Sequence, residues 1–185
     1  VADAIKEDSV TALAILNREG YKTVMITGDN EITAKSIAKQ VGIKEVIANV
    51  LPEDKSRKVE ELQKEGFVAF VGDGINDAPA LAKATIGISL SDASQVAMQT
   101  ADVVLMNHGL KNLPLALGLG KHTLITIKEN LFWAFIYNVI GIPVAAGVLF
   151  PLFGFLLNPM IAGAAMALSS VSVVSNSLRL KWTDL

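Results

Sequence analysis

The sequence of 185 residues contains no cysteine. This absence excludes a disulfide framework and any metal site built from thiolates of this chain alone. Charged side chains are also missing from one long stretch, because no Lys, Arg, Asp or Glu occurs between Asn130 and Leu178. The formal net charge of −2 offers no basic field, so nucleic acid is not an expected partner. The sequence begins at Val1 without a signal-peptide pattern, so we expect it to be part of a longer protein.

The distribution of charge divides the sequence near residue 120. The first 120 residues hold 12 Lys and Arg against 16 Asp and Glu, whereas the remainder holds 4 basic and 2 acidic residues. That remainder is dominated by apolar side chains. We therefore expect a soluble domain over residues 1–120 and a membrane part over residues 121–185.

The first part alternates between helical and strand-like patterns. We expect helices at residues 9–19, 31–41, 54–65, 77–83 and 91–99, and strands at 22–27, 46–50, 67–71, 86–90 and 103–106. Ser9 is expected to cap the first helix, and Gly42 to end the second. The alternation predicts an α/β fold with a parallel sheet and crossover helices. Ligands of such sheets bind at the carboxyl ends of the strands.

Two apolar stretches, at about residues 127–150 and 159–178, make up most of the second part. Each is as long as the roughly 20 residues that a membrane-spanning helix needs. The connector between them is uncharged, whereas basic residues flank both outer ends: Lys121, Lys128, Arg179 and Lys181. This pattern predicts a hairpin of two transmembrane helices with both ends, and the soluble domain, in the cytoplasm.

A turn with two glycines and two acids follows the strand expected at residues 67–71. In residues 72–77 (GDGIND) the glycines permit close approach of a ligand, and Asp73 and Asp77 carry the carboxylates that Mg²⁺ prefers. Taken alone, such a sequence is more often only a turn. Thr27 offers a hydroxyl to a phosphate oxygen at another strand end. Lys55 offers a cation, although it can equally be an ordinary solvated lysine.

These segments together resemble the phosphorylation domain of the P-type ATPases, in the haloacid dehalogenase superfamily. The resemblance rests on Thr27-Gly28-Asp29, on Lys55 and on residues 72–81 (GDGINDAPAL). It implies that Asp73 binds Mg²⁺, with Asn76 and Asp77 supporting the site. It also implies that Lys55 and Thr27 contact an aspartyl phosphate. Asp3 and Lys6 resemble the hinge into this domain, with Ala4 in place of the family's proline.

The family's phosphorylated aspartate lies in an Asp-Lys-Thr-Gly motif on the first strand, and the sequence has no such motif. We therefore expect a haloacid-dehalogenase-like sheet that lacks its first strand. Covalent catalysis needs its nucleophile, so the chain alone should not hydrolyse ATP, which the family binds mainly through a domain absent here. Two alternatives remain, a membrane-tethered phosphatase of this superfamily and a non-catalytic remnant of a pump. The phosphatase requires an Asp-x-Asp motif, which is also missing.

Polar side chains inside apolar stretches are costly in a membrane and point to function. The pattern in this sequence resembles that of the final two helices of copper(I)-transporting P-type ATPases. It consists of Asn130, Tyr137, Asn138 and Pro143, followed by Met166, Ser169 and Ser170. The resemblance implies that Tyr137, Asn138, Met166, Ser169 and Ser170 line the path of Cu⁺. A thioether suits this soft ion. For Ser172, Ser175 and Ser177 we favour helix packing.

The zinc, cadmium and lead subgroup carries a lysine and an aspartate in these helices, and neither is present here. The resemblance thus implies the C-terminal part of an ATP-driven copper(I) pump. Its partners would be the actuator and nucleotide-binding domains, the earlier membrane helices and the lipid bilayer. His108 and His122 are isolated, which favours a surface position over metal binding.

Overall fold

The computed structural model describes residues 5, 7–106, 109–154 and 158–182. The proposed hinge residues Asp3 and Lys6, together with His108, lie outside this range, as does the side chain of Met166. The chain forms two compact units, residues 1–115 and 116–185.

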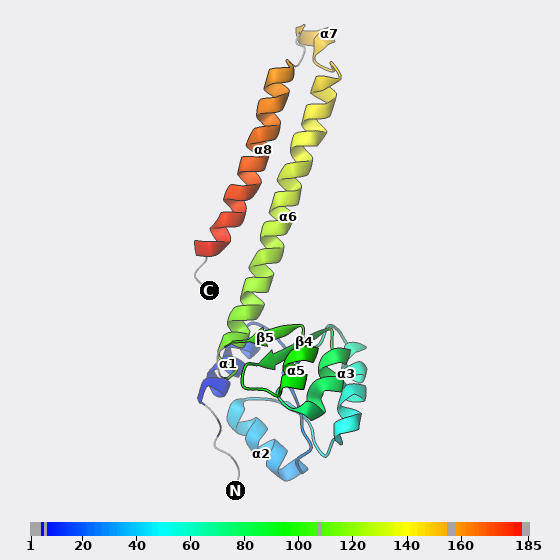
Figure 1. Ribbon diagram of the computed structural model, residues 1–185, viewed down its shortest axis with the longest axis vertical. Coiled ribbons are helices and arrows are strands. Elements are labelled where there is room, and N and C mark those ends of the chain that lie inside the picture. The colour runs from blue at the N-terminus through cyan, green and yellow to red at the C-terminus, as the bar shows by residue number, and fades with distance from the viewer. Residues whose placement is uncertain (1–4, 6, 107–108, 155–157, 183–185) are drawn as a thin grey trace. The chain divides into compact units, whose positions relative to one another are not determined.

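The first unit alternates between short helices and short strands (Figure 1). In chain order its elements are α1 (Glu7–Arg18), β1 (Val24–Ile26), α2 (Glu31–Val41), β2 (Glu45–Ile47), η1 (Pro52–Asp54), α3 (Lys55–Gln63), β3 (Ala69–Gly72), η2 (Ile75–Asp77), α4 (Ala78–Lys83), β4 (Ile86–Leu90), α5 (Gln95–Thr100) and β5 (Val103–Leu105). The predicted α/β fold with parallel strands is confirmed.

The strands form two sheets rather than one. β1 pairs with β2, and a separate sheet has the order β3-β4-β5, with every pairing parallel. Within the described residues, β1 and β3 are each hydrogen-bonded to a strand on one side only. The sequence predicted a haloacid-dehalogenase-like parallel sheet that lacks its first strand.

The core of this unit lies between the helices and the strands. Its most completely buried side chains are small or aliphatic and come from α2, α3, α4, β4 and α5: Ala34, Ala38, Val59, Ala80, Leu81, Ile88 and Ala97. Small residues let the helices pack closely on the sheet. Gly87 is one such contact, because a Cβ atom at this position would lie 2.5 Å from the carbonyl oxygen of Leu81.

The ends of α2 follow from local chemistry. The Asn30 side chain caps its first turn by accepting a hydrogen bond of 2.9 Å from the N–H of Thr33. Gly42 ends the helix with a φ of 79°, as predicted. The prediction for Ser9 is wrong, because α1 begins at Glu7 and Ser9 lies inside its first turn.

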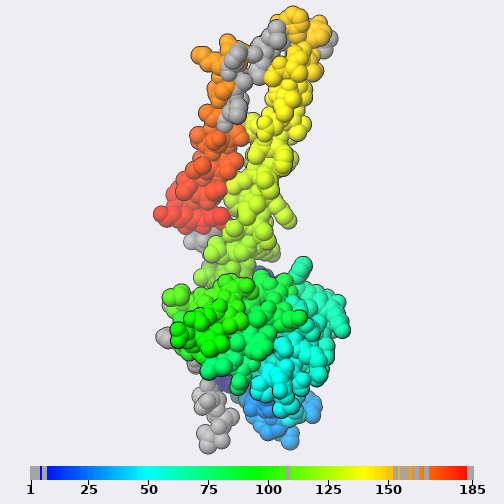
Figure 2. Space-filling model, turned by 45° about the vertical axis from the view of Figure 1, so that its right-hand side comes forward, coloured from blue at the N-terminus to red at the C-terminus, as the bar shows by residue number. Residues whose placement is uncertain are grey.

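The second unit contains most of the long helix α6 (Asn112–Ala145), then α7 (Phe150–Phe153), α8 (Pro159–Arg179) and η3 (Leu180–Trp182). α6 begins well before the expected residue 127, includes Pro143 in its last turn and ends before a turn at Gly147, which has a φ of 87°. α6 and α8 run side by side in opposite directions (Figures 1 and 2). Over the described part of the chain, no helix combines the length and the apolarity needed to cross a membrane.

Candidate functional site

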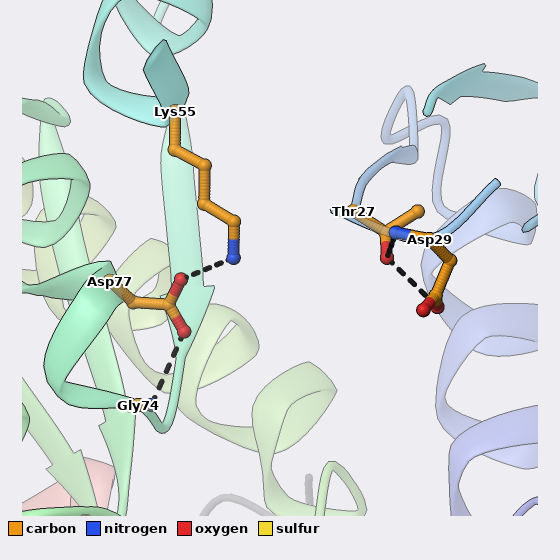
Figure 3. A network of polar contacts seen from close by, with 5 residues as sticks. All are labelled: Thr27, Asp29, Lys55, Gly74 and Asp77. Atoms are coloured by element: carbon orange, nitrogen blue, oxygen red, sulfur yellow. Dashed lines mark hydrogen bonds and ion pairs between the residues drawn. The ribbon is translucent and has the colours of Figure 1, made fainter. Parts of the chain in front are cut away.

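Lys55 and Asp77 form an ion pair where the segments after β2 and β3 meet. The Nζ atom of Lys55, at the start of α3, lies 2.7 Å from Oδ1 of Asp77 (Figure 3). The side chains are only 18% and 11% exposed, so water screens this pair less than a surface pair. The other carboxylate oxygen, Oδ2, accepts a hydrogen bond of 3.2 Å from the N–H of Gly74. Asp77 therefore orients the lysine and holds its own turn together.

The glycines of the turn make this arrangement possible. A Cβ atom at position 72 would lie 2.8 Å from the Cβ atom of Asp77, which is closer than real contacts allow. Only glycine lets the Asp77 side chain fold back against the end of β3. Asp73 itself is exposed, as is Asn76. The backbone carbonyl of Asp73 accepts a hydrogen bond of 2.9 Å from the N–H of Ser94.

Thr27 and Asp29 form a second polar pair, at the end of β1. The Thr27 hydroxyl donates to Oδ2 of Asp29 at 3.0 Å and accepts from the N–H of Asp29 at 3.1 Å (Figure 3). Two backbone hydrogen bonds anchor Thr27 to the segment around β2. Its N–H donates to the carbonyl of Ile47 at 3.0 Å, and its carbonyl accepts from Val50 at 3.1 Å.

The predicted phosphate-handling residues thus all lie at the carboxyl ends of parallel strands. Thr27, Gly28 and Asp29 follow β1, Lys55 follows β2, and residues 73–77 follow β3. The structure brings Lys55, which follows a strand of one sheet, to Asp77, which follows a strand of the other, and it brings Thr27 to Asp29 within the loop after β1. An ammonium, two carboxylates and a hydroxyl at one edge are suited to a phosphoryl group with its cation.

The predicted copper-path residues lie on α6 and α8. The Asn138 side chain donates to the carbonyl of Ala134 at 2.8 Å, and Tyr137 is 39% exposed, less than Phe135 or Val139. On α8, Ser169 is half-buried and Ser170 is exposed.

Two residues that the sequence did not single out make informative contacts. Ser94 caps α5 by accepting a hydrogen bond of 3.2 Å from Ala97, and its N–H holds the Asp73 loop. A serine near the start of the helix expected at residues 91–99 was the signal for this role. Asn176 joins α8 to Glu129 and Asn130 of α6. Its signal was an amide within an apolar helix.

Comparison with known proteins supports the interpretation from the sequence. Residues 1–85 match the family model of haloacid dehalogenase-like hydrolases. The chain is 53% identical to a copper-exporting P-type ATPase of Vibrio cholerae, and the match covers 100% of the chain and 20% of that protein. It is 54% identical to the probable copper-transporting ATPase PacS of Synechocystis, with 98% and 24% covered. The chain therefore spans about a quarter or less of the curated relatives.

A solved structure resembles the chain over nearly its whole length. The crystal structure of a zinc-transporting PIB-type ATPase in the E2.Pi state matches with a TM-score of 0.85 and 36% identity. The match covers 96% of this chain and 28% of that one. Sequence identity to the copper transporters is thus clearly higher than to this zinc transporter.

Proposed function

The chain belongs to the P-type ATPases, since it is homologous over its whole length to copper-transporting members, and on that premise we propose that it serves an ATP-driven copper(I) pump. Residues 1–120 supply the magnesium- and phosphate-handling part of the phosphorylation domain. Residues 121–185 supply two helices of the membrane region. The pairing of Lys55 with Asp77 beside Asp73, at the carboxyl ends of the strands, carries this proposal.

Magnesium is the cofactor that these side chains fit. Within the described residues, no group of three or more Asp, Glu, His or Cys side chains gathers to enclose a metal. Mg²⁺, however, usually binds proteins through one or two carboxylates together with substrate phosphate oxygens. Asp73 is exposed and free of steric cover, so we assign it as the direct ligand, with Asn76 beside it and Asp77 in support. The bound ion would neutralise charge on the phosphoryl group.

Lys55 and Thr27 then complete the phosphate site. The Lys55 ammonium, oriented by Asp77, faces the phosphoryl oxygens, and the Thr27 hydroxyl with the loop at Gly28 and Asp29 offers hydrogen bonds from the other side. The acceptor aspartate, the ATP-binding domain and the actuator domain belong to the remainder of the pump. The chain alone is then inactive, because it has no nucleophile of the required motif.

The proposed membrane segments are residues 127–150 and 159–178, with both outer ends in the cytoplasm. Support comes from the run without charges between Asn130 and Leu178 and from the homology to copper-transporting P-type ATPases. Large apolar side chains also stay exposed along both helices, among them Leu131, Phe135, Ile140, Leu168 and Val171. Tyr137, Asn138, Met166, Ser169 and Ser170 would line the path of Cu⁺.

A chimera tests this function directly. We would replace the matching part of the Vibrio cholerae relative with this chain and measure copper-dependent phosphorylation by ATP and copper efflux from vesicles. The chimera should show both activities. Asp73→Asn should lower phosphoenzyme formation by roughly a hundredfold or more, because the direct ligand of Mg²⁺ loses its charge.

The matched control is Glu19→Gln, which removes one exposed carboxylate outside the site. It should phosphorylate like the parent chimera. A chimera that folds but forms no phosphoenzyme would contradict the assignment to the pump. Normal phosphorylation of the Asp73→Asn variant would contradict the role of Asp73.

A further inference from the structure

A network of amide and hydroxyl groups joins α6 to α8 near one end of the helix pair. Asn176 donates to Oε2 of Glu129 at 3.1 Å and to Oδ1 of Asn130 at 3.0 Å. Asn130 donates in turn to the Ser177 hydroxyl at 2.9 Å. Both amino hydrogens of Asn176 are used, and its Oδ1 atom accepts a bond of 3.1 Å from Arg179. Two neighbouring residues on each helix therefore interlock.

The half-buried positions show which sides of the helices carry this network. On α6 they include Asn130, Ala134 and Gly141, and on α8 they include Ser169, Val173 and Asn176. Each set recurs at intervals of three, four or seven residues and so lies on one helical face. The network belongs to the same faces along which the two helices approach each other.

The hydrogen bonds fix the register of the two antiparallel helices. Both helices rise by about 1.5 Å per residue, so a step forward on α6 is matched by a step back on α8. Asn130 is bonded to Ser177. Seven residues on from Asn130 is Tyr137, and seven residues back from Ser177 is Ser170. One step further, Asn138 is level with Ser169.

We infer that Asn130 and Asn176 are positioning residues, which hold α6 and α8 in the register that sets Tyr137 and Asn138 level with Ser170 and Ser169. A slip by one helical turn would displace these pairs by about 5.4 Å and break all the bonds of the network. Directional hydrogen bonds add to side-chain packing a preference for one register. The link to copper rests on the proposed function. The register itself does not.

The absence of cysteine makes the register directly measurable by cross-linking in the complete chain in detergent micelles. Ala134→Cys with Val173→Cys places thiols level with each other, whereas Gly141→Cys with Val173→Cys places them two turns apart. A short dithiol-reactive reagent should cross-link the first pair faster. Adding Asn176→Leu removes both hydrogen bonds from Asn176 to α6 and should slow that reaction by roughly fivefold or more, since each lost hydrogen bond is worth about that factor, and it should speed the mismatched pair.

Three comparisons keep this test decisive. Ser175→Leu adds the same apolar side chain at the exposed neighbouring position and should leave the rates unchanged. Asn176→Gln keeps the amide and should restore part of the preference, which a variant that merely misfolds would not. Equal preference with and without Asn176→Leu would overturn the inference.

Copper efflux by the chimera provides the second readout. Asn176→Leu should reduce copper efflux relative to the parent chimera. Normal phosphorylation of the parent chimera by ATP shows that the reference pump is active. If the parent chimera transports no copper but the cross-linking preference depends on Asn176, the proposed function fails and the register inference stands. If Asn176→Leu changes the preference without any effect on efflux, the positioning role in transport is wrong.

Discussion

Gly87 shows how one missing side chain determines the packing of α4 on β4. Its N–H donates to Oδ2 of Asp102 at 2.8 Å, and its carbonyl accepts from the N–H of Asp102 at 2.9 Å. These two bonds fix the backbone of β4 in place beside β5. The Cα atom of Gly87 faces the last turns of α4, where the carbonyl of Leu81 leaves no room for a methyl group. Sequence patterns do not reveal this contact, because it depends on how two elements pack.

Gly87→Ala should therefore destabilise the first unit by about 1–3 kcal/mol, the usual cost of overpacking in a core. The atom that the new methyl group meets belongs to the backbone and cannot swing aside. Urea unfolding followed by far-UV circular dichroism measures the effect. Gly66→Ala is the control, because nothing lies within 4 Å of a Cβ atom there. Equal midpoints for the two variants would contradict the packing argument.

The site residues were predictable to different degrees. The motif of residues 72–77 identified Asp73 and Asp77 together, but it could not separate their roles. The structure does so: both oxygens of Asp77 are occupied, by Lys55 and by the N–H of Gly74, whereas Asp73 is exposed. Lys55 and Asp77 are 22 residues apart, and only the packing of α3 beside the turn brings them together.

At the scale of an element, α2 carries an ion pair between its first residue, Glu31, and Lys35 one turn further on. The Lys35 ammonium lies 2.6 Å from Oε1 of Glu31, and both side chains are about two-thirds exposed. The hydrogen bond from Lys35, with its charge, holds the pKa of the Glu31 carboxyl below its usual value. A lowered pKa means that the stabilisation is present above the pKa of the unfolded chain. It is lost as the pH falls through the lower pKa of the folded state.

Lys35→Met should consequently raise the pKa of Glu31 toward its usual value and weaken the pH dependence of helix stability in mildly acidic solution. Because the pair is exposed, added salt should reduce the difference. NMR titration of the side-chain carboxyl carbon reports the pKa directly. Lys39→Met, at the other end of α2, is the control. An unchanged Glu31 titration in the Lys35 variant would show that the pair is not formed in solution.

The helices of the second unit were predictable in position but not in extent. The sequence placed the first apolar stretch at residues 127–150, whereas α6 begins at Asn112 and ends at Ala145. A hydropathy pattern shows where apolar residues begin, not where a helix begins. The first residues of α6, before Lys121, were therefore assigned to the domain over residues 1–120. At the far end, Pro143 and Gly147 interrupt the hydrogen bonds of the helix before the apolar stretch itself ends.

The proposed membrane contact of α6 can be tested with its single tryptophan. Trp133 is 50% exposed and lies inside the apolar stretch, near its first end, whereas Trp182 lies beyond the end of α8. In lipid vesicles, the Trp182→Phe variant leaves Trp133 as reporter, and lipids labelled with a quencher in their acyl chains should quench its fluorescence strongly. The Trp133→Phe variant should be quenched less by such lipids. Equal weak quenching of both reporters would contradict insertion of α6.

On the scale of the whole molecule, the division into two sheets is the main departure from the predicted fold. β1 and β3, which are followed by Thr27 and Asp73, each leave one edge without a strand among the described residues. Two- and three-stranded parallel sheets are small for this fold class. The resemblance to P-type ATPases accounts for the gap, because the strand that carries the acceptor aspartate is the one the sequence lacks.

A synthetic peptide with an Asp-Lys-Thr-Gly motif after an apolar strand should therefore bind between β1 and β3 as a parallel strand. Hydrogen exchange of the complete chain should then slow at Val24–Ile26 and at Ala69–Gly72, since amides at these edges gain partners. The outer strands β2 and β5 serve as internal controls. A peptide with proline at the central strand positions should protect neither edge. Protection confined to β2 or β5 would contradict binding of the peptide between β1 and β3.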